Sequence, residues 1–154
     1  MRVIDFYGRA IYGGVLHGVH RVALARDIPM RKIVGNDLHF IANEAFLGKI
    51  KQFDFIGYNK NFGGLSASPR SYAKAMNDSR FAATFPHIKI AYDASREVLF
   101  RSPIFAQLKL FSKLGLAIAV FWARIYCYYY RVQVWSRVQR RIINPLFGKR
   151  TAST

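Results

Sequence analysis

The segment between Pro103 and Pro145 constrains the fold of this chain more than any other feature. It holds about 40 residues with no acidic side chain and one internal glycine, Gly115. Ser102 and Pro103 are residue types that begin helices, as N-cap and first helical residue. We predict one long helix over residues 103–143, roughly 60 Å long at about 1.5 Å per residue. A chain of 17.7 kDa cannot bury such a helix alone, so we expect much of it to lie against a membrane or a large assembly.

The first half of this helix, residues 104–126, is predicted to cross a membrane once. Its charge-free centre, residues 114–123, is about 15 Å long, against a hydrocarbon thickness of about 30 Å. Lys113 and Arg124 extend that length if they snorkel towards opposite interfaces. Aromatic residues typical of an interfacial belt gather at the C-terminal end: Trp122, Tyr126, Tyr128, Tyr129 and Tyr130. The alternative is an amphipathic helix that lies flat on a surface.

The basic residues of this helix are predicted to form its contact surface. At 100° per residue, the first four fall on one stripe about 60° wide. We expect seven basic residues to contact anionic phospholipid such as cardiolipin, or acidic side chains of neighbouring subunits. They are Lys109, Lys113, Arg124, Arg131, Arg137, Arg140 and Arg141. Basic residues are more numerous beyond the C-terminal end of the span than before it, which predicts the C-terminus on the matrix side of a mitochondrial membrane.

Charge divides the chain near residue 100. The net charge is +16, and all eight acidic residues precede residue 98. Three regions are therefore expected: a mixed-charge part over residues 1–100, the acid-free helix over 101–143, and a basic tail over 144–154. A 52% hydrophobic composition excludes disorder of the polar, highly charged kind. Such an excess of positive charge favours a polyanionic partner, either a lipid surface or nucleic acid.

Residues 1–26 resemble a mitochondrial targeting segment, because they carry four arginines and one acidic residue. The interpretations left open are an uncleaved import signal that packs in the mature protein and an ordinary amphipathic first helix. The uncharged run over residues 10–20 is too short to cross a bilayer.

Short helices are expected in the rest of the first region. Asn36 is predicted to cap a helix that ends at Gly48. Residues 53–58 are a strand or turn and residues 57–71 a loop. A second helix is expected from Ser68-Pro69 to about Phe85, where Pro86 would end it. The predicted fold class is thus mainly α: an irregular region with short helices, one long helix, and no independent large core.

No catalytic, cofactor or metal site is predicted. His17 and His20 are three residues apart, but no further ligand has a recognisable spacing from them. Gly14 and Gly18 permit close helix contact and form a weak motif. The only cysteine, Cys127, lies among tyrosines without an evident base, so an inert buried thiol is expected.

These patterns favour a non-catalytic accessory subunit of a large mitochondrial inner-membrane complex, of the respiratory chain or the ATP synthase. Its expected partners are other subunits and anionic phospholipid. The alternative is a basic mitochondrial ribosomal protein that binds rRNA, because aromatic and basic residues alternate over residues 128–141. The apolar stretch over residues 114–123 argues against that alternative. A third hypothesis, a small lipid-active or haem-binding enzyme, depends on His17 and His20 alone.

Overall fold

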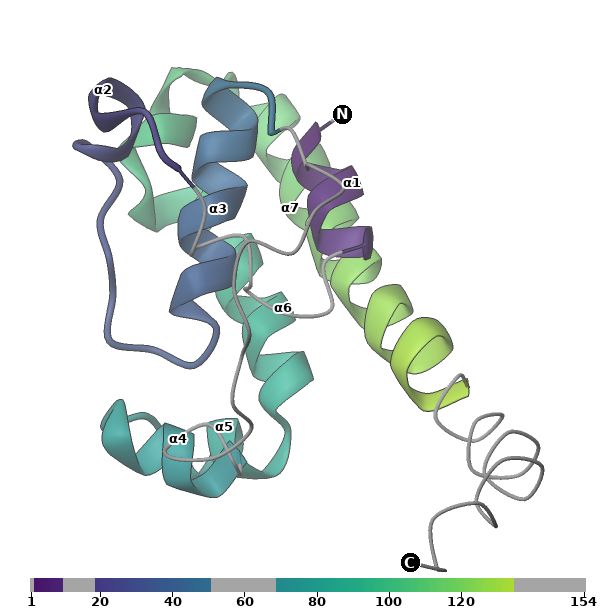
Figure 1. The fold of residues 1–154 in the computed structure, drawn as a ribbon. Coiled ribbons are helices and arrows are strands. Elements are labelled where there is room, and N and C mark those ends of the chain that lie inside the picture. The colour runs from purple at the N-terminus through teal and green to yellow at the C-terminus, as the bar shows by residue number, and fades with distance from the viewer. Residues whose placement is uncertain (1, 10–18, 51–68, 135–154) are drawn as a thin grey trace, which may run out of the picture.

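The computed structural model describes residues 2–9, 19–50 and 69–134, and within these ranges the chain is helical and contains no strand. The mainly α fold class is confirmed. In chain order the elements are α1 (Arg2–Arg9), α2 (Val22–Ala25), α3 (Asn36–Leu47), α4 (Pro69–Ala75), α5 (Arg80–Thr84), α6 (Pro86–Arg96), a π-helical segment (Glu97–Arg101), a 3-10 helix (Pro103–Gln107), α7 (Leu110–Tyr126) and a second π-helical segment (Cys127–Val134). Figure 1 shows α7 along one side of the molecule, with α1 and α6 against it.

The long apolar helix is present, but it begins at Leu110 and not at 103. Ser102 is an N-cap as predicted, since its hydroxyl accepts a hydrogen bond from the Ile104 amide at 3.2 Å. It caps a 3-10 helix, which rarely exceeds one turn. Leu108 and Lys109 are then extended, with ψ of 142° and 150°. Buried Phe105 explains this break, because its ring packs edge-on against Phe46 of α3 and holds the 3-10 turn on the core.

The helix α3 ends at Gly48 as predicted, but its N-cap lies one residue before Asn36, the expected cap. The N-cap is Gly35, with φ of +82°, a backbone conformation that favours glycine. A Cβ there would lie 2.8 Å from Cγ1 of Ile90, so the site also needs glycine for space. Asn36 accepts a hydrogen bond from the Tyr72 hydroxyl at 3.0 Å, which ties α3 to α4.

The helix before Pro86 ends at Thr84, close to the predicted Phe85, but Pro86 also begins a further helix that was not predicted. The expected single helix up to Phe85 consists of α4 and α5, separated where Ser79 caps α5 through its hydroxyl. Pro86 is the first residue of α6, a position where a missing amide hydrogen costs nothing because no intrahelical acceptor is available there. The prediction missed α6, although α6 is the main neighbour of α7.

The core lies where α1, α3, α6 and α7 meet. Small residues allow α6 and α7 to approach closely: Ala91, Ala94 and Ala117 are all buried. The Ser95 hydroxyl donates to the Ala117 carbonyl at 2.9 Å across this contact. Larger buried members include Val3, Tyr7, Leu38, Ile90, Val98, Leu116 and Val120. Residues from both sides of position 100 therefore share one core.

A buried ionic network anchors α6 and the π-helical segment after it. Asp93 has no exposed surface, and its carboxylate binds the Lys89 ammonium and, at 3.4 Å, the Arg101 guanidinium. Glu97 is also buried and binds Arg31 at 2.8 Å. The network has three acidic and three basic members: Asp78, Asp93, Glu97, Arg31, Lys89 and Arg101. Each carboxylate of the network therefore has a cationic partner, which offsets the cost of burying its charge.

Candidate membrane-contact helix

The outer face of α7 is lined by large apolar side chains that the described chain does not cover. Phe111 is 86% exposed, Ile118 60% and Trp122 63%. Together with Leu114 these residues follow the spacing of one helix face, three or four residues apart. We call Phe111, Leu114, Ile118 and Trp122 the outer face of α7. Tyr126, Tyr129 and Tyr130 are also exposed near its C-terminal end. A contiguous apolar face of this kind marks a contact surface for membrane or protein.

The opposite side of α7 is packed against α1 and α6. Its buried residues are Leu116, Ala117, Val120 and Arg124, followed by Cys127 in the next segment. The lone cysteine is thus buried.

Three residues of the predicted basic stripe have described side chains, and these three differ in exposure. Arg124 is only 2% exposed and faces the interior of the chain. Lys113 is half-buried on the same side of α7, and Lys109 is exposed but precedes the helix. Arg131 lies in the second π-helical segment, and its side chain is outside the described residues. Arg137, Arg140 and Arg141 lie outside them altogether, as does the predicted tail over 144–154.

The continuous helix over Leu110–Tyr130 has 21 residues and is long and apolar enough to cross a membrane. At about 1.5 Å per residue it approaches the hydrocarbon thickness of about 30 Å. Only 28% of its most apolar stretch is buried, whereas a core helix of a soluble protein is mostly buried. The part of the chain that the structure describes therefore contains one candidate span, close to the predicted residues 104–126.

A buried polar cluster lies behind the outer face, where α1, α3, α6 and α7 meet. The Tyr7 hydroxyl and Nδ1 of His39 are 2.8 Å apart. Nη2 of Arg124 lies 3.5 Å from Nδ1 of His87, and the His87 ring stacks on Tyr128 with centroids 3.5 Å apart. Nε2 of His39 has no hydrogen-bond partner among the described residues. The sequence alone gives no sign of this cluster, since Tyr7, His39 and His87 have no common spacing.

Burial controls protonation in this cluster. Burial, with Arg124 as the next largest cause, lowers the pKa of His39 to about 3 and that of His87 to about 4. Burial, followed by the charge of Glu97, raises the pKa of Tyr7 above its usual value. All three groups are therefore neutral near pH 7, so the hydrogen bond between Tyr7 and His39 joins two uncharged side chains.

The stability of the fold is expected to decline below pH 6.5, the ordinary pKa of histidine, because of His39 and His87. Above pH 6.5 the His39 ring is neutral in both the folded and the unfolded state. At lower pH only the unfolded chain takes up the proton, until the pH reaches the folded-state pKa of His39, about 3. At pH 5 this difference costs about 2 kcal/mol. Urea unfolding at pH 7 and pH 5 measures it, and His39→Gln should remove this share of the decline. Tyr7→Phe is the matched control, since it lowers stability at both pH values and leaves the ring to titrate. An unchanged decline in the His39→Gln variant would contradict this assignment.

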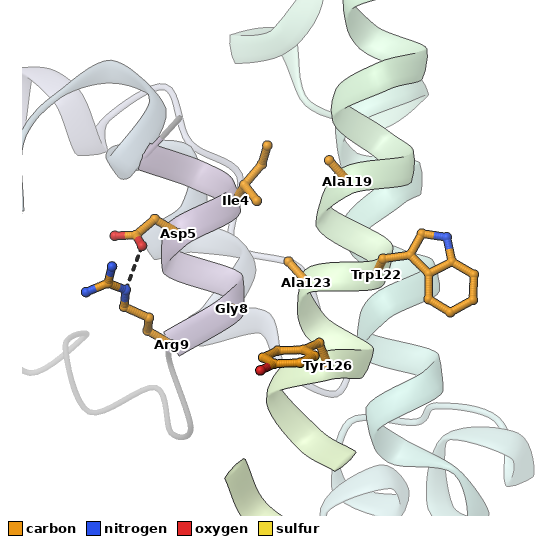
Figure 2. A pocket seen from close by; sticks show the side chains of 8 residues that line it. All are labelled: Ile4, Asp5, Gly8, Arg9, Ala119, Trp122, Ala123 and Tyr126. Atoms are coloured by element: carbon orange, nitrogen blue, oxygen red, sulfur yellow. Dashed lines mark ion pairs between the residues drawn. The ribbon is translucent and has the colours of Figure 1, made fainter. Parts of the chain in front are cut away.

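A shallow groove of about 630 Å³ runs between α1 and α7 (Figure 2). Small residues form its floor, and the Cβ position of Gly8 lies 3.8 Å from the Cβ of Ala123, an ordinary contact. On one side the exposed pair Asp5–Arg9 is joined at 2.6 Å. The lining residues are Ile4, Asp5, Gly8, Arg9, Ala119, Trp122, Ala123 and Tyr126. Trp122 belongs to both the groove and the outer face of α7.

The two histidines of the sequence motif are not both described. His20 lies 2.7 Å from the carboxylate of Glu44 in α3, whereas His17 and the pair Gly14 and Gly18 lie outside the described residues. Residues 53–58 lie outside them too. Among the described residues no three His, Cys, Asp or Glu side chains are placed to hold a metal ion.

No family model, curated protein or solved structure matches this chain.

Proposed function

We propose that this protein is a non-catalytic accessory subunit of a large complex in the mitochondrial inner membrane, of the respiratory chain or the ATP synthase. The observation that carries the proposal is the two-sided packing of α7. Small residues and Arg124 face α1 and α6, whereas the outer face of α7 presents Phe111, Ile118 and Trp122 away from the chain. Exposure of such a face to water is unfavourable, and contact with lipid or with an apolar neighbour stabilises it.

A complex suits this arrangement better than an isolated span. The helices α1 and α6 pack on α7 and would accompany it into the bilayer. The Asp5 and Arg9 side chains on α1 are 57% and 75% exposed, and hydrocarbon around them would be unfavourable. Neighbouring subunits would supply polar surroundings for these side chains and leave the outer face of α7 for lipid or an apolar partner.

The mitochondrial location is supported by charge. The net charge of +16 favours a membrane rich in anionic phospholipid, such as cardiolipin. The arginines of α1 suit an import signal, and α1 is held in the mature fold because Val3 and Tyr7 are 0% and 2% exposed. With Arg124 buried, the proposed lipid and subunit contacts are Lys109, Lys113, Arg131, Arg137, Arg140 and Arg141. The C-terminus then faces the matrix, which protease accessibility in sealed vesicles of known sidedness tests.

Membrane attachment is the first test. After extraction with carbonate at high pH, we expect the wild-type protein to remain with the membrane pellet. An Ile118→Glu variant should be released, because a charged residue at the centre of a span costs about 3 kcal/mol. Val22→Glu is the matched control, since Val22 is 69% exposed but lies on α2. Complete release of the wild-type protein, or equal release of both variants, would contradict a membrane-inserted α7.

Association with a complex is the second part of the test. After mild detergent extraction, native separation should place the protein in one large complex of the inner membrane. The ribosomal alternative makes a different prediction, namely stoichiometric amounts in ribosomal particles and binding that falls steeply between about 50 and 200 mM salt. That result would overturn the subunit proposal.

A further inference from the structure

A second surface with exposed apolar and basic side chains lies on α4 and α5, which pack on each other as a hairpin. Phe81 is 46% exposed and Phe85 is 50% exposed, and their ring centroids are 5.5 Å apart. The two residues are four positions apart, so they lie on the same side of α5. Arg70, Lys74 and Arg80 are exposed on the same hairpin. We call these five residues the hairpin surface.

The three basic side chains of the hairpin surface are available to a partner. None of them takes part in an ion pair with another described residue. The acidic residue of the hairpin, Asp78, has a side chain that is only 7% exposed. Its carboxylate accepts hydrogen bonds from the amides of Val34 at 3.0 Å and Ser79 at 2.7 Å. Over residues 69–86 the exposed surface therefore carries three positive charges and no negative charge.

The hairpin is held at the C-terminal end of α7. The helix α5 leads into α6 at Pro86, and the next residue, His87, stacks on Tyr128 with ring centroids 3.5 Å apart. Figure 1 shows α4 and α5 at the lower end of α6, the end that this contact places beside the segment after α7. Buried Ala73 and Ala82 join the hairpin to the core. The hairpin surface therefore lies at the same level along α7 as three exposed tyrosines, Tyr126, Tyr129 and Tyr130.

We propose that the α4–α5 hairpin lies in the headgroup layer of an anionic membrane, with Phe81 and Phe85 at the acyl-chain boundary and the three basic side chains on lipid phosphates. This inference deepens the proposed function and rests on it, because an inserted α7 brings the bilayer surface to this level. It assigns lipid contact to residues outside the span and outside the basic residues named above. Two contacts, the span and the hairpin, then fix the depth and the rotation of α7 in the bilayer.

The composition and the position of the hairpin surface together select a bilayer as its partner. Helices that lie in a membrane interface combine aromatic or aliphatic side chains, which enter the acyl boundary, with basic side chains that contact anionic headgroups. Exposed tyrosines at the same level are typical of the interfacial end of a span. An acidic protein surface would pair with the basic residues and leave both phenylalanine rings in water. Single-stranded RNA also binds through basic and aromatic side chains, but it does not account for the position of the hairpin at the end of a candidate span.

The test measures the environment of the hairpin in the full chain, reconstituted into vesicles of phosphatidylcholine and phosphatidylglycerol. A Thr84→Cys variant carries an environment-sensitive fluorophore beside Phe85, and Cys127 is too buried to react with the label. We expect blue-shifted emission that is quenched by lipids with a nitroxide near the headgroup. The matched control is Ala23→Cys, labelled on α2, which is exposed and lies at the opposite end of the molecule (Figure 1). Its probe should report water.

Neutralising the basic residues tests the contact with phosphates. One triple variant changes those of the hairpin surface: Arg70→Gln, Lys74→Gln and Arg80→Gln. It should lower the ratio of lipid-bound to water-exposed probe about a hundredfold, since each basic residue at an anionic surface contributes about fivefold. The matched control is the triple variant Arg21→Gln, Arg26→Gln and Lys32→Gln, which removes the same charge from exposed residues around α2 and should leave the ratio unchanged. Vesicles of phosphatidylcholine alone should lower the ratio as the first variant does.

Replacing the two phenylalanines tests the apolar part of the hairpin surface. Phe81→Ser and Phe85→Ser should each lower the same ratio about tenfold, because about half of each ring is exposed and would leave water on insertion. Phe100→Ser is the matched control, since Phe100 is 80% exposed but lies beyond the other end of α6. Circular dichroism and the unfolding midpoint report whether each variant is folded.

The outcomes distinguish this proposal from the proposed function. A probe at position 84 that stays in water, in a protein that carbonate leaves in the membrane pellet, overturns the hairpin contact alone. Equal losses for the two triple variants overturn the assignment of the phosphates. Binding of RNA that depends on the hairpin surface, without entry of the probe into lipid, overturns the choice of a membrane. Entry of the probe into lipid, in a protein that carbonate releases, supports the hairpin contact and contradicts a membrane-inserted α7.

Discussion

Replacing Asp93 by alanine is expected to cost about 3–5 kcal/mol of unfolding free energy, because it removes the closest carboxylate from two largely buried cations. Asp93 has no exposed surface and binds both Lys89 and Arg101, which are themselves 15% and 26% exposed. Removing it leaves Lys89 with the longer contact to Asp78 at 3.6 Å and Arg101 with the one to Glu97 at 4.0 Å, beside the π-helical segment that follows α6. Chemical denaturation of the variant, followed by circular dichroism, measures the loss.

The control for this prediction is a carboxylate of the same type on the surface. Asp5 pairs with Arg9 at 2.6 Å within α1, but both side chains are more than half exposed. Asp5→Ala should therefore change stability by less than about 1 kcal/mol. Similar losses for Asp5→Ala and Asp93→Ala would show that the network around α6 does not hold the fold together.

Charge reversal at Arg124 should impair folding and assembly far more than charge reversal at Lys49. Arg124 is 2% exposed, in a cluster with His87, whereas Lys49 is exposed after the end of α3. Arg124→Glu places a carboxylate in the interior at a cost of about 3–5 kcal/mol, and Lys49→Glu should stay within about 0.5 kcal/mol. The amount of protein in the native complex and the unfolding free energy of the purified variants provide the two readouts.

A neutral substitution separates the charge of Arg124 from its volume. Arg124→Met removes the cation and keeps a long side chain against the cluster, so it should retain stability within about 1.5 kcal/mol of the wild type. If Arg124 instead contacted lipid or another subunit, as its place on the basic stripe suggested, Arg124→Met and Arg124→Glu would leave the isolated protein equally stable. They would then reduce only its incorporation into the complex.

Local sequence was sufficient to predict helix ends where a single residue type determines the backbone conformation. Gly48 ends α3 and Ser102 is an N-cap, as predicted. The Ser102 cap is a local contact, because its hydroxyl accepts from the amide of Ile104 two residues later. The end of α5 before Pro86 was predicted, but the start of α6 at the same residue was missed, because proline is compatible both with the end of one helix and with the first turn of the next. The choice depended on Phe85 as N-cap and on the packing of α6 against α7.

The start of α7 could not be predicted from local sequence, for a different reason. The residues from 103 onwards are all compatible with a helix, and composition alone predicts an uninterrupted one. The interruption of the helix at Leu108 depends on Phe105. Its ring packs against Phe46, which lies almost sixty residues earlier in the chain. No local pattern contains that contact.

The sequence by itself determined the helical class, the apolar and acid-free character of the segment after residue 100, and the angular stripe on which Lys113 and Arg124 lie. All three follow from composition and from the helical repeat. Only the tertiary structure decided which side of α7 is covered. Because α1 and α6 pack on the side that carries Arg124, that side chain faces inwards and Phe111, Ile118 and Trp122 remain outside. Helical periodicity assigns residues to a face, but the segments that cover a face come from elsewhere in the chain and are chosen by packing.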